Sequence, residues 1–184
     1  MGVTAKEISA VLAAAELLYD QAQIQLALDD MARRIARDLK GRDPIVLCVM
    51  NGGIVVTGHL LMRLDFPLQL DYVHATRYRG QTRGGELRWQ KKSTLALEDR
   101  VVLIVDDILD EGYTLAGILD CCRAQGAQQV TTAVLVNKHH VRKQPGAHAE
   151  YVGLTVDDRY VFGFGMDYKG YLRNLPAIYA VKAA

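Results

Sequence analysis

The sequence has little cysteine, no long hydrophobic run and no excess of one charge sign. Its three cysteines, Cys48, Cys121 and Cys122, are odd in number and show no zinc-binding spacing, so we expect reduced thiols in a cytoplasmic protein. The apolar stretch 10–15 is too short to cross a membrane, and the first residues lack the basic-then-apolar layout of a secretory signal. These absences predict a soluble, cytoplasmic protein with no membrane partner.

The charges are nearly balanced, with 22 Lys and Arg against 21 Asp and Glu and a net charge of +1. Bulk charge therefore gives no reason to expect a nucleic acid partner, and any anionic ligand must be held by local geometry. The 184 residues, of which 50% are hydrophobic, fit a single domain spanning residues 1–184. A chain of this length buries enough surface to fold without disulfides.

The hydrophobic pattern predicts an α/β fold. An apolar run at 45–50, a glycine turn and a helical stretch to about Arg63 form a strand–turn–helix unit. The run 101–105 is the most apolar of the chain, as expected of a central parallel strand. We expect a mostly parallel central sheet with helices on both faces, a small hood, and a flexible lid loop at 77–85. Further strands are predicted at 68–75, 86–92, 131–136, 151–156 and 177–181, and further helices from Thr4 to about Tyr19, from Asp20 to Leu39 and at 115–125.

Acidic residues follow the most apolar strand. Asp106 and Asp107 come directly after it, Asp110 comes next, and Gly112 and Thr114 precede a predicted helix. In open α/β sheets ligands bind beyond the carboxyl ends of strands, and a glycine loop at a helix N-terminus binds anions. The pattern favours a phosphorylated sugar, with acids on its hydroxyls or on a divalent cation. Two alternatives are that the acids only solvate a strand end and cap a helix, or that the chain is a response-regulator receiver domain, whose acid pair instead follows the first strand.

The stretch from Asp106 to Thr114 resembles the 5-phosphoribosyl pyrophosphate (PRPP) loop of type I phosphoribosyltransferases. The resemblance implies that the ribose and its phosphate contact this loop, and that Asp110 handles the proton at N7 of a base. Glu111 departs from the family pattern, which has Thr, Ser or Ala at this position. The residues implied in ribose and phosphate binding are Asp106, Asp107, Asp110, Glu111, Gly112, Tyr113 and Thr114.

The C-terminal half is similar to that of hypoxanthine-guanine phosphoribosyltransferases, which implies a base site. Lys138 would donate to the exocyclic oxygen of a 6-oxopurine, Tyr160 would stack on the base, and Val161 would bond its edge through the backbone. Asp167, beside the base, would coordinate Mg²⁺ together with Asp106 and Asp107. Without the resemblance, a lysine at a strand end is usually only solvated, and an aromatic next to a valine is an ordinary strand pair. Arg173 would bind the pyrophosphate.

The turn Asn51-Gly52-Gly53 is similar to the pyrophosphate-binding turn of the same family, although many relatives have Lys in place of Asn51. The glycines would let the backbone approach the pyrophosphate. Arg77 and Tyr78 correspond to the lid that closes over the reaction. The resemblance thus implies Mg²⁺-dependent transfer from PRPP to hypoxanthine or guanine by a homodimer or homotetramer. Alternatives are a xanthine-preferring transferase and a nucleotide-sensing regulator of this fold that binds RNA or DNA.

Overall fold

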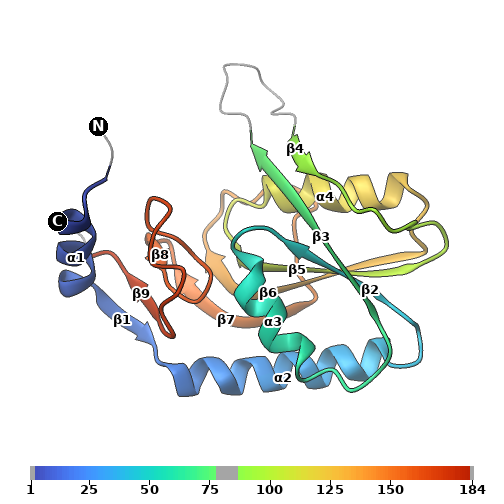
Figure 1. Ribbon diagram of the computed structural model, residues 1–184, viewed down its shortest axis with the longest axis horizontal. Helices are drawn as coiled ribbons and strands as arrows, with labels where there is room; N and C mark the ends of the chain where they lie inside the picture. The colour runs from blue at the N-terminus through green and yellow to red at the C-terminus, as the bar shows by residue number, and fades with distance from the viewer. Residues whose placement is uncertain (1–2, 78–86, 183–184) are drawn as a thin grey trace.

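Two β-sheets organise the chain in the computed structural model, which describes residues 3–77 and 87–182 (Figure 1). The larger sheet has six strands in the order β4-β3-β2-β5-β6-β7, and the smaller has three in the order β1-β9-β8. The helices are α1 (Ala5–Ala14), α2 (Gln21–Leu39), α3 (Gly53–Leu61) and α4 (Tyr113–Ala124); the strands are β1 (Glu16–Tyr19), β2 (Ile45–Val49), β3 (Gln69–Arg77), β4 (Leu87–Lys91), β5 (Val101–Leu109), β6 (Gln129–His139), β7 (Tyr151–Asp157), β8 (Val161–Phe162) and β9 (Ile178–Ala180).

The larger sheet is parallel except at one edge, where β4 runs antiparallel to β3, as predicted. The two central strands are β2 and β5, and Ile45 of β2 lies opposite Val102 of β5. Both faces of these strands are covered, which is why their sequences are continuously apolar rather than alternating.

Helices cover both faces of the larger sheet, which confirms the predicted layers (Figure 1). Because successive side chains of a strand point to opposite faces, Leu103 of β5 packs with α2 and α3, whereas Val102 packs with α4. Helix α2 begins at a capping box in which Asp20 accepts from the Gln23 backbone N–H and the Gln23 side chain bonds back. Within the described residues, no helix combines the length and hydropathy that a membrane crossing requires.

The smaller sheet corrects the prediction of a helix from Thr4 to about Tyr19. Helix α1 ends at Ala14, and residues 16–19 form β1, which pairs antiparallel with β9 near the C-terminus. The Tyr19 hydroxyl donates to the Thr155 carbonyl oxygen, 2.7 Å away. A pairing partner about 160 positions later in the chain overrides the local helical pattern, and a short window of sequence contains no sign of it.

Strand β5 is longer than its apolar run. Residues 106–109 were predicted to lie in a loop, but they continue the strand and pair with β6 as far as Leu109 opposite Asn137. Asp106 and Asp107 therefore stand on a paired strand rather than on a free loop, and Asp110 directly follows the strand. The predicted hairpin strand 86–92 is confirmed as β4, while the lid residue Tyr78 lies outside the described residues.

Candidate functional site

Two adjoining cavities open at the carboxyl end of β5. The larger, of about 570 Å³, is lined by the predicted phosphate and pyrophosphate residues, including Asn51, Gly52, Arg173 and residues 110–114. The smaller, of about 230 Å³, is lined by Lys138, Tyr160, Val161 and Met166. Four residues line both cavities: Asp107, Ile108, Asp110 and Asp167. Residues predicted from four separate stretches of sequence thus meet at one strand end.

In the acid pair at this strand end, Asp107 is buried and Asp106 is partly buried. Burial, and then the charge of Asp107, raise the pKa of Asp106 well above its usual range. Burial also raises the pKa of Asp107, although hydrogen bonding and the Arg173 guanidinium oppose the rise. The Asp107 carboxylate accepts from the Ile108 backbone N–H at 2.8 Å, and the closest Arg173 nitrogen lies 3.8 Å from it. Two adjacent carboxyls with this little compensation would be stabilised by a cation.

The turn after β2 needs its glycines because the end of β5 lies directly against it. A Cβ at Gly52 would overlap the Asp107 carboxylate. A Cβ at Gly53 would lie 2.7 Å from the Val105 carbonyl oxygen and 3.2 Å from the Asp106 Cα. That these glycines make room for pyrophosphate stays a prediction; the structure shows that they make room for the acid-bearing strand itself. Gly53 lies beneath the site and does not line either cavity.

Arg173 joins the C-terminal segment to the acids. Its guanidinium donates to the Gly165 carbonyl oxygen at 2.6 Å and pairs with the Asp167 carboxylate, also at 2.6 Å. Asp167 in turn accepts from the Gly170 backbone N–H at 2.7 Å, which closes the turn that carries it. Arg173 and Asp167 therefore reach the site as a pair, and the Arg173 guanidinium lies between the carboxylates of Asp167 and Asp107.

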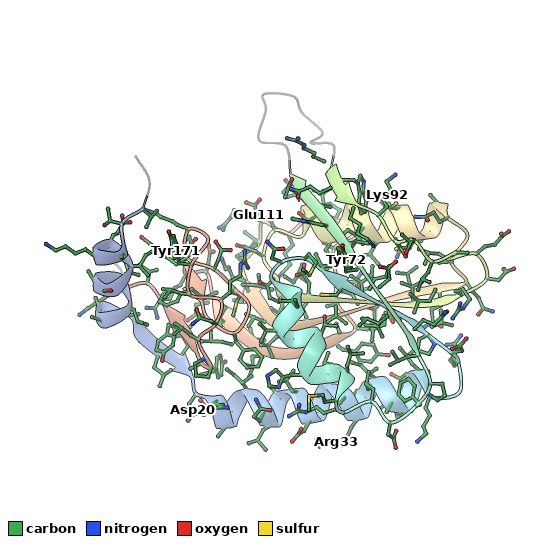
Figure 2. The ribbon with its side chains drawn as sticks, in the orientation of Figure 1. Asp20, Arg33, Tyr72, Lys92, Glu111 and Tyr171 are labelled. Atoms are coloured by element: carbon green, nitrogen blue, oxygen red, sulfur yellow. The ribbon has the colours of Figure 1, made fainter. Side chains whose placement is uncertain are left out.

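The loop between β5 and α4 has the form of an anion site. Gly112 caps α4 with φ +81°, a left-handed conformation that favours glycine, and a Cβ there would overlap the Ala147 side chain. Tyr113 and Thr114, in the first turn of α4, line the larger cavity, and the N-terminus of a helix attracts anions. Figure 2 labels Glu111 near this end of the sheet, between β3 and the C-terminal segment that carries Tyr171.

Lys143 fixes this loop from behind, and sequence reasoning missed it. Its ammonium donates to the Asn137 side-chain oxygen at 2.6 Å, to the Lys138 carbonyl oxygen at 2.7 Å and to the Leu109 carbonyl oxygen at 3.4 Å. Next to it, the Gln144 backbone N–H donates to the Glu111 carbonyl oxygen at 2.7 Å. The ends of β5 and β6 are thus tied together under the loop. A lysine in a polar turn gives no sequence signal of such a role.

The smaller cavity brings the predicted base-binding residues together. Lys138, at the end of β6, is only 8% exposed, and its ammonium donates to the Asp110 carboxylate at 2.6 Å. Tyr160 is 51% exposed, and its ring meets the edge of Tyr168 at a centroid distance of 5.5 Å. Val161, by contrast, is buried at the start of β8. A flat, open aromatic face, a buried cation and a strand backbone therefore border one small space.

His140 is a second residue that sequence reasoning missed. Its Nε2 lies 2.7 Å from the other oxygen of the Asp110 carboxylate, and its side chain is 4% exposed. Burial alone would raise the pKa of Asp110, but the hydrogen bonds from Lys138 and His140 outweigh it and hold the pKa below its ordinary value. A signal existed, because His140 directly follows β6, the strand that carries Lys138, at the carboxyl end where ligands bind.

The lid residues are the part of the prediction that the described residues do not test. Arg77 is the last residue of β3. Tyr78 falls outside the described residues, so the lid stays a prediction. Every other predicted site residue except Gly53 lines one of the two cavities.

Comparisons with known proteins agree with this geometry. Residues 14–169 match the family model described as a phosphoribosyl transferase domain. A hypoxanthine-guanine-xanthine phosphoribosyltransferase from Tritrichomonas foetus is 31% identical over 166 residues, which cover 90% of this chain and 91% of that protein. A hypoxanthine-guanine phosphoribosyltransferase from Staphylococcus epidermidis is 31% identical over 168 residues, covering 91% and 93%. A solved hypoxanthine phosphoribosyltransferase from Staphylococcus aureus superposes with a TM-score of 0.88 at 27% identity, covering 94% of this chain and 95% of that one.

Proposed function

This chain belongs to the phosphoribosyltransferase family, and on that premise we propose that it salvages purines by transferring the 5-phosphoribosyl group of PRPP to hypoxanthine or guanine. The observation that carries the proposal is the pair of cavities sharing Asp107, Ile108, Asp110 and Asp167. One cavity has the features that suit a sugar phosphate and the other those that suit a base, so the bond between sugar and base would form where they meet.

In the proposed reaction a purine ring nitrogen forms a bond to C1 of the ribose while the bond from C1 to the pyrophosphate oxygen breaks. The base loses its N7 proton to Asp110, which stands between the two cavities. The N-terminus of α4 and Thr114 hold the 5′-phosphate, and Arg173 binds the departing pyrophosphate. Proton transfer of this kind contributes about 10²–10⁴-fold to rate.

Lys138 would select the base. An ammonium group donates a hydrogen bond to the carbonyl oxygen at position 6 of hypoxanthine or guanine. The amino group of adenine cannot accept this bond, so adenine binds less well. Tyr160 would cover one face of the base with its exposed ring, and Val161 would bond the edge of the base through its backbone. Two sheets contribute to the site, because Val161 belongs to β8 and Lys138 to β6, and this supports residues 1–184 acting as one catalytic unit.

The residues of the site fit a Mg²⁺ ion. Among the described residues that line the two cavities there are five carboxylates and two cations, the cations being Lys138 and Arg173, so an anionic substrate gains little from side-chain charge. We propose that Asp106, Asp107 and Asp167 hold Mg²⁺, directly or through its waters, since hard carboxylate oxygens are its preferred protein ligands. Bound there, the ion would neutralise charge that develops on pyrophosphate.

The assembly and location of the protein are also proposals. Ile54 of α3 and Leu70 and Tyr72 of β3 are exposed apolar side chains near one another, which supports a homodimer or homotetramer. Light scattering after size exclusion measures this. The free thiols of all three cysteines fit a cytoplasmic location.

The test of the proposed function is pyrophosphate release from PRPP with hypoxanthine, guanine, xanthine and adenine in turn. Xanthine belongs in the panel because the Tritrichomonas foetus relative is named for all three 6-oxopurines. We expect turnover with hypoxanthine and guanine and none with adenine, and Asp110→Asn should lower kcat by about 10²–10⁴-fold with little change in PRPP binding. No turnover with any 6-oxopurine would refute the proposal, and an unimpaired Asp110→Asn would remove Asp110 from the reaction.

A further inference from the structure

Both oxygens of the Asp110 carboxylate are hydrogen-bonded, and the two bonded groups have different roles in the proposed reaction. Lys138 donates to Oδ2 at 2.6 Å, and the His140 Nε2 lies 2.7 Å from Oδ1. In the proposed reaction Lys138 must turn to the exocyclic oxygen of the base, and it then no longer holds Asp110. His140 has no such second task, because it lines neither cavity.

The tautomer of His140 follows from its second hydrogen bond. The Arg142 backbone N–H donates to the His140 Nδ1 at 3.1 Å, so this nitrogen acts as an acceptor and carries no proton. The neutral ring then has its proton on Nε2, and Nε2–H donates to Asp110. The backbone donor at Nδ1 therefore fixes both the orientation of the ring and the position of its proton on Nε2.

The surroundings keep this ring in place. Its side chain is 4% exposed, and the turn that supplies the Arg142 N–H is fastened by a two-point ion pair from the Arg142 guanidinium to Asp158, at 2.7 and 3.0 Å. Lys143 ties the same turn to the end of β5 through the Leu109 carbonyl oxygen. The donor that faces Asp110 is thus fixed through Leu109, the last residue of β5, which directly precedes Asp110.

We propose that His140 is a positioning residue: its Nε2–H holds Oδ1 of Asp110, so that Oδ2 stays aimed at the N7 proton of the base after Lys138 has turned to that base. The inference rests on the proposed function, because it assigns Asp110 as the proton acceptor. It adds a member to the site that neither cavity reveals. Without His140, the carboxylate would rotate about its χ angles once Lys138 had left.

Two amide substitutions distinguish a hydrogen bond from position 140 to Asp110 from simple packing of the His140 side chain. His140→Asn keeps an oxygen that accepts from the Arg142 N–H but ends short of Asp110, whereas His140→Gln extends an amide N–H to where Nε2 was. We expect His140→Asn to lower kcat by about 10- to 100-fold, the scale of a displaced reacting group, with KM for PRPP unchanged. His140→Gln should restore most of the lost kcat, and His139→Asn, at the exposed neighbour, should match the unsubstituted protein.

A double-mutant cycle decides whether His140 acts through Asp110. In the Asp110→Asn background, adding His140→Asn should cost no further kcat, because the group to be positioned is gone. An equal loss in both backgrounds, equal impairment by Asn and Gln, or an unimpaired His140→Asn would each overturn the inference. If the unsubstituted protein itself turns over no 6-oxopurine, the proposed function fails instead, so the two failures are distinguishable. Thermal melts of each variant detect unfolding, and the comparison of Asn with Gln then uses only variants that fold.

Discussion

The first two turns of α3 offer a matched pair of glycines whose replacement should act in opposite directions. At Gly53 a Cβ would lie 2.7 Å from the Val105 carbonyl oxygen, which is backbone of β5 and cannot swing away. Overpacking of this kind costs about 1–3 kcal/mol, and the helical preference for alanine returns up to about 1 kcal/mol of it. Gly58, in the same helix, has no atom within 4 Å of its added Cβ. Gly58→Ala therefore keeps the helix gain, about 0.5–1 kcal/mol, without the collision.

For a chain of this length 1 kcal/mol moves the melting temperature by about 2–4 °C. Gly53→Ala should thus lower Tm by up to about 8 °C, and Gly58→Ala should raise it by about 1–4 °C. The assay is thermal unfolding of both variants at one protein concentration, with size exclusion to show that their assembly is the same. Gly53→Ala should also lower kcat/KM, because the strand segment it displaces carries Asp106. Equal shifts of Tm in one direction for both variants would refute the reasoning from close approach.

Three further predictions use other parts of the structure. Lys143→Met should lower the free energy of unfolding by about 3 kcal/mol, because it removes the donor from three oxygen acceptors. Lys182→Met, at an exposed lysine, should change it by less than about 0.5 kcal/mol. Urea unfolding measures both variants, and equal effects would contradict the prediction. Burial alone would raise the pKa of Asp71, but hydrogen bonds from Lys91, Thr94, Tyr72 and Ser93 outweigh it and lower the pKa. The unfolded chain then binds more protons than the native one as pH falls below about 4. Asp71→Asn should therefore lower the free energy of unfolding by about 2–3 kcal/mol at pH 7, and by progressively less below pH 4, as measured by urea titrations. A stability difference between the two proteins that grows in acid would contradict the prediction. Tyr160→Leu should raise KM for hypoxanthine by about 5- to 150-fold through lost stacking, whereas Tyr171→Leu, 52% exposed on the same segment, should leave KM unchanged in the pyrophosphate-release assay.

The sequence predicted those parts of the fold that are encoded locally. The continuous apolar run of β5, the helix that follows Asp20 and the glycine turn after β2 each depend on neighbours within a few positions, and each is confirmed. Residues 16–19 were predicted wrongly because their partner, β9, lies at the other end of the chain. Strand β5 also continues through Asp106 and Asp107, but polar side chains at these positions gave no sequence sign of the pairing with β6.

The candidate site was predictable as a set of residues but not as a set of contacts. Motif resemblance identified Asp110 and Lys138 separately, 28 positions apart, and nothing in the sequence showed that the two form an ion pair. The sequence also did not show that Asp107 is the nearest neighbour of the missing Cβ of Gly52. Distances between segments depend on how strands pack, and a pattern of residue types does not contain them.

Strand order explains why this strand end, and no other, gathers the site. β5 lies between β2 and β6, and all three run parallel, so the segments that follow them emerge at one edge of the sheet. The segment after β2 supplies Asn51 and Gly52, the segment after β5 supplies the phosphate loop, and the segment after β6 supplies His140 and Lys143. Once β5 is identified as central from its apolar run, any polar residue just beyond a neighbouring parallel strand becomes a candidate for the site. By that rule His140 belonged among the candidates from the sequence onward, because it stands one residue past the end of β6.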